Sequence, residues 1–158
     1  MSPSELQEFL HRSVPLSKAM SVCVEAVSPE RLVLTAPMEP NINQHGTIFG
    51  GSSATLALLS AWSLLHTRLV SESIACKLVV QRTAMEYNAP MSGIFAASAS
   101  LAPSANWKHF VHAIQVKGKA RIQVVATLQA SAEVAGHLEG EFVAIREHTG
   151  ASQVSRAK

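Results

Sequence analysis

Apolar residues along this chain fall into several short runs and one long run, which dominates the pattern. In the segment 54–65 almost every residue is apolar, and no Asp, Glu, Lys or Arg lies between Glu39 and Arg68. A helix that is apolar on every side is normally buried by its own protein. The continuous apolar part is well short of the ~20 residues that cross a bilayer, and serines interrupt it. We therefore expect a central core helix that begins at the glycine pair 50–51, and no membrane span.

The segments on either side of this helix have the composition of β-strands. They combine β-branched and apolar residues and are separated by Pro, Gly and Ser. We expect strands at 20–27, 31–38, 76–89, 94–101, 120–130 and 140–145, with the last two linked around Gly136. Ser28, Pro29 and Glu30 are short enough to join the first two strands as a hairpin.

Two shorter helices are predicted by the residues at their ends. Ser2 and Glu5 match a capping box, and Pro15 should end the first helix. Ser104 is the expected cap of a second helix, which Gly118 closes. Each has an apolar stripe: Leu6, Phe9 and Leu10 in the first, and Trp107, Phe110, Val111 and Ile114 in the second.

The order of these elements favours an α+β fold. One buried helix among strands sufficient for a single sheet indicates a curved antiparallel sheet wrapped around that helix. We expect one domain over residues 1–147, with the N-terminal helix inside 1–14, and a disordered tail over 148–158. Such a sheet has open edges, and pairing of two chains edge to edge would close one of them.

Composition narrows the function. The net charge of the 158-residue chain is +2, too small to indicate a nucleic-acid surface. Cys23 and Cys76 lie far apart, so neither a disulfide framework nor a zinc site is expected. Glu5 and Glu8 stand where a signal peptide would be basic and then apolar, so we expect a cytoplasmic protein. All eleven acidic residues are Glu, and the chain contains no Asp.

The loop that leads into the central helix is the candidate site. A helix N-terminus carries free N–H groups and a partial positive charge, and glycines there let a ligand oxygen approach the backbone. The polar residues of segment 41–47 crowd the same place. A glycine pair before a helix is also common as a mere tight turn, so this alternative stays open.

Two motifs and the order of elements resemble the hotdog fold of acyl-CoA and acyl-carrier-protein thioesterases. Residues 43–51 are similar to the N-x-x-G-x-x-H-G-G pattern before the central helix of phenylacetate-type members, and residues 85–90 (MEYNAP) with Gly93 resemble their Y-x-x-P strand end. The longer string NINQHGTIFGGS at 41–52, with Ala61 and Trp62, resembles the YiiD C-terminal-like branch of thioesterases. The resemblance spans roughly residues 15–147.

This chain departs from the phenylacetate-type pattern at two positions. Phe49 stands where that pattern has His, and Leu58 stands where it has the Asp that serves as base or nucleophile. With no Asp in the chain and no Glu between Glu39 and Glu72, the central helix has no carboxylate to replace it. Catalysis by that carboxylate is excluded here.

The resemblance implies roles for the remaining residues. The N–H of Gly51, helped by that of Gly50, matches the oxyanion position. Asn43 matches the family's polar residue and would donate to the carbonyl or orient a water, and His45 would act as acid or base unless it is simply solvated. We expect substrate-binding contacts from Asn41, Thr47, Phe49, Ser52, Glu86 and Asn88. Three of these residues have alternative roles. Asn41 would instead fix the loop, Glu86 would face solvent, and Ser52 would form hydrogen bonds at the start of the helix.

Three functions remain open. The first is hydrolysis of an acyl-CoA or acyl-carrier-protein thioester, and the second is decarboxylation of a malonyl carrier thioester, which needs no protein carboxylate. The third is an acyl-binding protein without catalysis. No metal and no cofactor is expected, since CoA or phosphopantetheine enters as part of the substrate. Five cations are candidates to meet CoA phosphates or an acidic carrier protein, unless they are only solvated: Lys77, Arg82, Lys117, Lys119 and Arg121.

Overall fold

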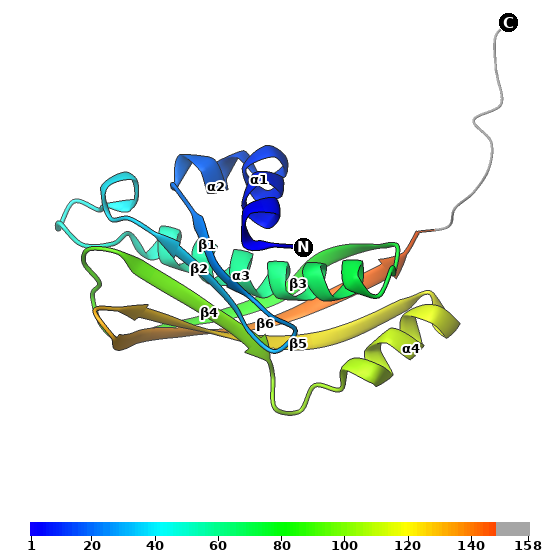
Figure 1. The fold of residues 1–158 in the computed structure, drawn as a ribbon. Coiled ribbons are helices and arrows are strands. Elements are labelled where there is room, and N and C mark those ends of the chain that lie inside the picture. The colour runs from blue at the N-terminus through cyan, green and yellow to red at the C-terminus, as the bar shows by residue number, and fades with distance from the viewer. Residues whose placement is uncertain (148–158) are drawn as a thin grey trace, which may run out of the picture.

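The computed structural model describes residues 1–147 and shows one curved sheet folded around a long helix (Figure 1). Six strands, each antiparallel to its neighbours, lie in the order β1-β2-β4-β5-β6-β3. Their bounds are β1 (Cys23–Val27), β2 (Leu32–Ala36), β3 (Cys76–Tyr87), β4 (Phe95–Leu101), β5 (Lys119–Ala130) and β6 (Glu133–Arg146). The α+β architecture with a curved antiparallel sheet around one central helix is therefore confirmed. The predicted tail, 148–158, lies outside the described residues.

The central helix α3 (Gly50–Ser71) begins at the predicted glycine and lies along the sheet. Its inward side is fully buried: Leu56, Ala57, Leu64 and Leu65 have no exposed surface. The expectation of burial on every side fails for one stripe, in which Leu58 and Trp62 are half-exposed. The reason is that a single sheet wraps only part of a helix and leaves this stripe partly covered, by contacts such as that of the Phe9 ring stacked on Trp62. None of the described helices is long and apolar enough to cross a membrane.

The N-terminal helix α1 (Pro3–Ser13) has the predicted capping box between Ser2 and Glu5. Hydrogen bonds from the backbone and side chain of Ser2 lower the pKa of the Glu5 carboxyl. Pro15 ends α1 as predicted, but it also starts a second helix, α2 (Pro15–Ala19), which was not predicted. Proline is well suited to the first position of a helix, so the same residue both ends α1 and starts α2. As a result β1 starts at Cys23 and not at residue 20.

The two edges of the sheet differ. Along β1, the side-chain oxygen of Gln7 accepts a hydrogen bond from the Val24 N–H at 3.0 Å, and His11 Nε2 lies 2.8 Å from the Val22 carbonyl oxygen. Helix α1 thus covers that edge. Strand β3 forms the other edge, pairs only with β6 and is mostly exposed, with Val79 38% and Val80 42% accessible. Long exposed edges are sites of pairing with another chain.

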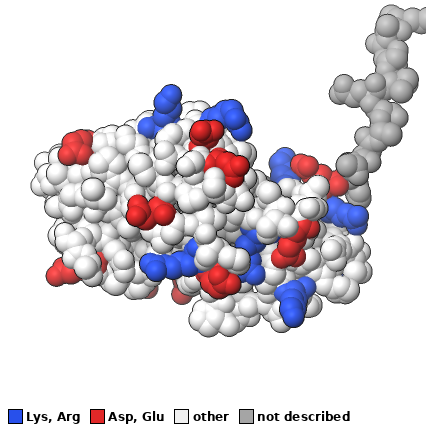
Figure 2. Space-filling view, in the orientation of Figure 1, with Lys and Arg blue, Asp and Glu red and all other residues white. Residues whose placement is uncertain are grey.

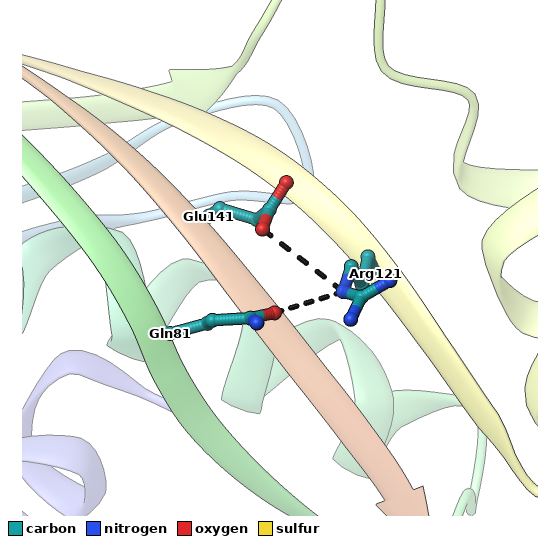
Figure 3. Close-up of polar contacts among 3 residues, drawn as sticks. All are labelled: Gln81, Arg121 and Glu141. Carbon is teal, nitrogen blue, oxygen red and sulfur yellow. Dashed lines mark hydrogen bonds and ion pairs between the residues drawn. The ribbon is translucent and has the colours of Figure 1, made fainter.

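Polar side chains tie edge strand β3 to the rest of the sheet (Figure 3). Gln81 lies at a bulge in β3, and its Oε1 accepts a hydrogen bond from Arg121 Nε of β5 at 2.8 Å. Arg121 Nε also lies 4.0 Å from a carboxylate oxygen of Glu141 on the intervening β6. On the face drawn in Figure 2, Lys and Arg side chains are interspersed with acidic side chains.

The C-terminal half corrects two predictions. Strand β6 begins at Glu133, well before residue 140, because the turn is made by Ser131 and Ala132, both in the left-handed region (φ 51° and 65°). Gly136 lies inside β6, where an added Cβ would come 2.5 Å from the Glu86 carbonyl oxygen. This glycine permits close approach of two strands and makes no turn.

The helix between β4 and β5 is also displaced from its prediction. Helix α4 (Trp107–Lys117) is capped by Asn106, whose side chain accepts a hydrogen bond from the His109 N–H at 2.9 Å, and not by Ser104. Its predicted glycine cap is confirmed, since Gly118 has φ 71°. Helix α4 contacts β5 and β6, and its Trp107 ring lies under the guanidinium of Arg68, 4.1 Å from the ring centre.

Candidate functional site

The loop before α3 is pinned to the body of the protein by Asn41, the last residue of the short 3-10 helix η1 (Glu39–Asn41). This side chain is 1% exposed, and its Nδ2 donates to the carbonyl oxygens of Met20 and Pro37 at 3.0 and 2.8 Å. The Asn41 carbonyl oxygen in turn accepts the Phe49 N–H at 2.7 Å. Asn41 therefore fixes the two ends of the loop and does not line the pocket beside α3.

The centre of the loop is a tight turn built by Asn43. Its Oδ1 accepts the N–H groups of His45 and Thr47 at 2.8 and 3.2 Å, and its Nδ2 donates to Thr47 Oγ1 at 3.0 Å. Gly46 completes the turn with φ 75°. His45 is exposed at the tip, with its Nε2 3.1 Å from Gln44. Both ends of the Asn43 amide are thus used inside the loop, and this residue positions the start of α3.

Helix α3 starts without a side-chain cap. Its N-cap residue is Phe49, whose side chain cannot accept a hydrogen bond. Among the described residues, the N–H groups of Gly50, Gly51 and Ser52 have no acceptor, and the first one satisfied is that of Ser53, bonded to the Phe49 carbonyl oxygen at 3.1 Å. Free N–H groups and the helix dipole together favour an oxygen that carries negative charge.

The Phe49 ring covers one side of this N-terminus. It is 54% exposed, and it lies so close to Gly51 that a Cβ added there would collide with the ring. Glycine at 51 is therefore required for the ring to rest in this place.

A pocket of about 310 Å³ adjoins the first turn of α3. It is lined by Ile48, Gly50, Ser53, Tyr87, Asn88, Ala89, Pro90, Met91 and Ala135. The Tyr87 hydroxyl, at the end of β3, donates to the Gly50 carbonyl oxygen at 3.2 Å, and the Asn88 N–H donates to the Ala135 carbonyl oxygen at 2.8 Å. The pocket thus joins the start of α3, the end of β3 and the start of β6.

The predicted site residues divide into two groups. Gly50 and Asn88 line the pocket, and Phe49, Gly51 and half-exposed Ser52 lie beside it on the chain. Thr47 is held in the Asn43 turn, His45 is at its tip, and Glu86 is exposed on β3 opposite His137. Tyr87 was missed, although the Y-x-x-P motif contained it.

The lining of the pocket carries no formal charge. None of its lining residues is acidic, basic or a histidine. Three of the cations expected to meet phosphates, Lys117, Lys119 and Arg121, line a separate hollow between α4 and β5. Arg82 lines another with Glu139 and Glu141. Within residues 1–147, no three His, Cys or Glu side chains lie together as a metal site requires.

The fold and this site define a hotdog protein, and comparison with known proteins identifies its family. The chain belongs to the family described as "Putative thioesterase (yiiD_Cterm)", whose model matches residues 3–146. The resemblance carried by the sequence motifs is thereby confirmed.

Solved structures share the fold. The chain is similar to a protein of unknown function from Chlorobaculum tepidum TLS, with 29% identity, a TM-score of 0.86, and coverage of 92% of this chain and 94% of that one. It is also similar to a "putative thioesterase" from Shewanella oneidensis (22% identity, TM-score 0.80, coverage 90% and 96%). A thioesterase from Haemophilus influenzae is more distant in sequence (13% identity, TM-score 0.74, coverage 95% and 96%).

Proposed function

We propose that this protein hydrolyses acyl thioesters of CoA or of an acyl carrier protein at the N-terminus of α3. The observation that carries the proposal is the uncapped helix start, with free N–H groups at Gly50, Gly51 and Ser52, beside an open pocket. Membership of the thioesterase family supports the same chemistry. The thioester carbonyl oxygen would point at these donors, with the N–H of Gly51 as the principal one.

In this reaction the oxygen of a water molecule bonds to the carbonyl carbon, and negative charge develops on the carbonyl oxygen. Fixed N–H donors stabilise that charge more in the transition state than in the ground state. The carbon–sulfur bond then breaks, one proton of the water passes to the leaving sulfur, and a free thiol and a carboxylic acid result. Asn43 acts by shaping the loop that presents the donors, and His45 lies at the tip of that loop.

The pocket lining favours a second candidate, decarboxylation of a malonyl thioester. An acidic residue in the lining would repel the malonyl carboxylate, and the lining contains none. Breaking the bond between the carboxyl carbon and the adjacent carbon releases CO₂ and leaves the electron pair on the thioester as an enolate. The same N–H groups would stabilise the enolate oxygen before protonation gives an acetyl thioester. This reaction requires no base from the protein.

We also propose that the protein works as a homodimer in the cytoplasm, paired through β3. The other edge of the sheet is covered by α1, whereas β3 pairs only with β6 and exposes the side chains of Val79 and Val80. Pairing there would also cover the half-exposed stripe of α3 that contains Leu58, because Trp62 of that stripe donates to the Leu78 carbonyl oxygen of β3 at 3.1 Å.

Mass spectrometry of products separates the candidates. The protein is incubated with acetyl, butyryl and malonyl thioesters of CoA and of an acyl carrier protein. Free acid and free thiol establish hydrolysis, whereas CO₂ and an acetyl thioester establish decarboxylation. Binding of these thioesters without any product would contradict both reactions and leave a non-catalytic acyl-binding protein.

A further inference from the structure

The pocket beside α3 is open at one end and closed at the other. Its outer wall, residues 87–90, is exposed, whereas three side chains at its inner end are buried. Ile48 and Met91 are each 6% exposed, and Ser53 is 1% exposed. An acyl group that enters past Tyr87 therefore meets Ile48, Ser53 and Met91.

No channel continues behind these three residues along the inward side of α3. The residues after Ser53 on this side, Leu56, Ala57 and Ser60, are 0% exposed. A side chain without accessible surface borders no space that would hold a water molecule, and a methylene chain is wider than water. The core is close-packed here, as protein interiors generally are. The pocket depth is thus limited by the side chains at its inner end.

Hydrogen bonds hold this inner end in place. The Ile48 N–H donates to the Met91 carbonyl oxygen at 2.9 Å, which joins the loop before α3 to the segment after β3. Ile48 is also bridged to Ile42 across the Asn43 turn. The backbone of the end wall is therefore fixed on both sides, and only the side chains of Ile48 and Met91 set how far the pocket reaches.

We propose that Met91 and Ile48 limit the acyl group to a short chain, so that the substrates are short-chain acyl thioesters. This inference rests on the proposed thioester-processing site and specifies its substrate class. A longer chain would have to displace two buried side chains of the core. Met91 is the more adaptable of the two because its side chain is unbranched and flexible, so its truncation should lengthen the pocket.

The test compares kcat/KM on acetyl, butyryl, hexanoyl and octanoyl thioesters of N-acetylcysteamine. One methylene in an apolar pocket is worth roughly 10–200-fold, so wild-type kcat/KM should fall at least tenfold, as an order of magnitude, from butyryl to hexanoyl. Met91→Ala should recover most of the kcat/KM that wild type loses on the hexanoyl thioester. Met20→Ala is the matched control, because Met20 is a buried methionine (5% exposed) outside the pocket, and it should keep the wild-type profile.

Ile48→Val is a second variant, to be used if Met91→Ala is unstable. It removes one methylene, is expected to fold, and should shift the chain-length profile in the same direction as Met91→Ala. Wild-type protein that turns over octanoyl as fast as butyryl thioester would overturn the proposal, as would an unchanged profile in both pocket variants. If no thioester is turned over, the proposed reaction fails separately. Calorimetric affinities for thioether analogues of the same chain lengths then decide the length limit, which requires weaker binding from hexanoyl onward.

Discussion

At the scale of single residues, the free N–H of Gly51 is the group on which the proposed chemistry depends. Gly51→Pro removes this N–H, and proline is tolerated in the first turn of a helix. Gly51→Ala keeps the N–H but places the same Cβ against the Phe49 ring. We expect turnover of the proline variant to fall about 10²–10³-fold below that of the alanine variant, measured at saturating thioester. Equal turnover in the two variants would exclude this N–H from the mechanism.

Asn43 offers a second test, because its amide oxygen accepts hydrogen bonds whereas its amide nitrogen donates one. Asn43→Asp keeps the oxygen that accepts from His45 and Thr47 but loses the Nδ2 donor, whereas Asn43→Ala loses both. If Asn43 acts by shaping the loop, we expect kcat to fall in the alanine variant and to be largely retained in the aspartate variant. An aspartate variant as inactive as the alanine variant would instead indicate direct donation to the substrate. Circular dichroism of both variants checks that the fold is intact.

His66 should make the stability of the protein depend on pH. Its ring is stacked with Phe9 and Trp62, with ring centres 4.8 and 4.6 Å away, and burial lowers its pKa from the usual 6.5. The folded state therefore favours the neutral ring. The stability that His66 contributes is fully present above pH 6.5, and it is lost as the pH falls through the lower pKa of the folded state.

The measurement is thermal melting of wild type and of His66→Phe, which keeps a flat ring but cannot take up a proton. The variant should lose less stability than wild type when the pH is lowered from neutral to well below 6.5. Exposed His112 provides the control, since His112→Phe should lose as much as wild type. Identical losses in all three proteins would show that His66 is not the group responsible.

At the scale of elements, helix α1 acts as a cover for the β1 edge. Gln7→Ala with His11→Ala removes both hydrogen bonds to Val24 and Val22, each worth about 0.5–1.5 kcal/mol. We expect a lower urea midpoint and, because the strand edge becomes available, more aggregation on partial unfolding. Glu8→Ala changes an exposed residue of the same helix and should behave as wild type. Unaltered stability and solubility in the double variant would show that α1 does not protect this edge.

Some elements of the fold were predictable from the sequence, and others were not. The start of α3 was predictable because a glycine pair and the onset of an apolar run coincide at one place in the chain. Gly136 was misread as a turn because its reason, the carbonyl oxygen of Glu86, lies on another strand. Tyr87 was missed for the same reason, since its contact with Gly50 joins residues 37 positions apart. Local signals located the site, but contacts between distant segments complete it.

At the scale of the whole molecule, the open β3 edge predicts the assembly. Light scattering of dilute protein should give twice the 16.9 kDa chain mass, because pairing covers the exposed backbone and Val80. Val80→Lys should shift the protein toward monomer, since a charge on a strand edge opposes pairing. Val116→Lys is the control, because Val116 is 67% exposed on α4, away from β3. A folded, fully active monomer would refute the dimer.

The missing helix cap also bears on how this sequence is maintained. Serine at position 49 would accept a hydrogen bond at the start of α3 and stabilise the protein by about 1 kcal/mol. In the genetic code a single base change converts a phenylalanine codon into a serine codon, so this gain is within reach of ordinary mutation. Such a serine would occupy a donor that the proposed reaction needs and would remove the ring over Gly51. Phe49 is therefore a position where selection for thermal stability and selection for turnover should act in opposite directions.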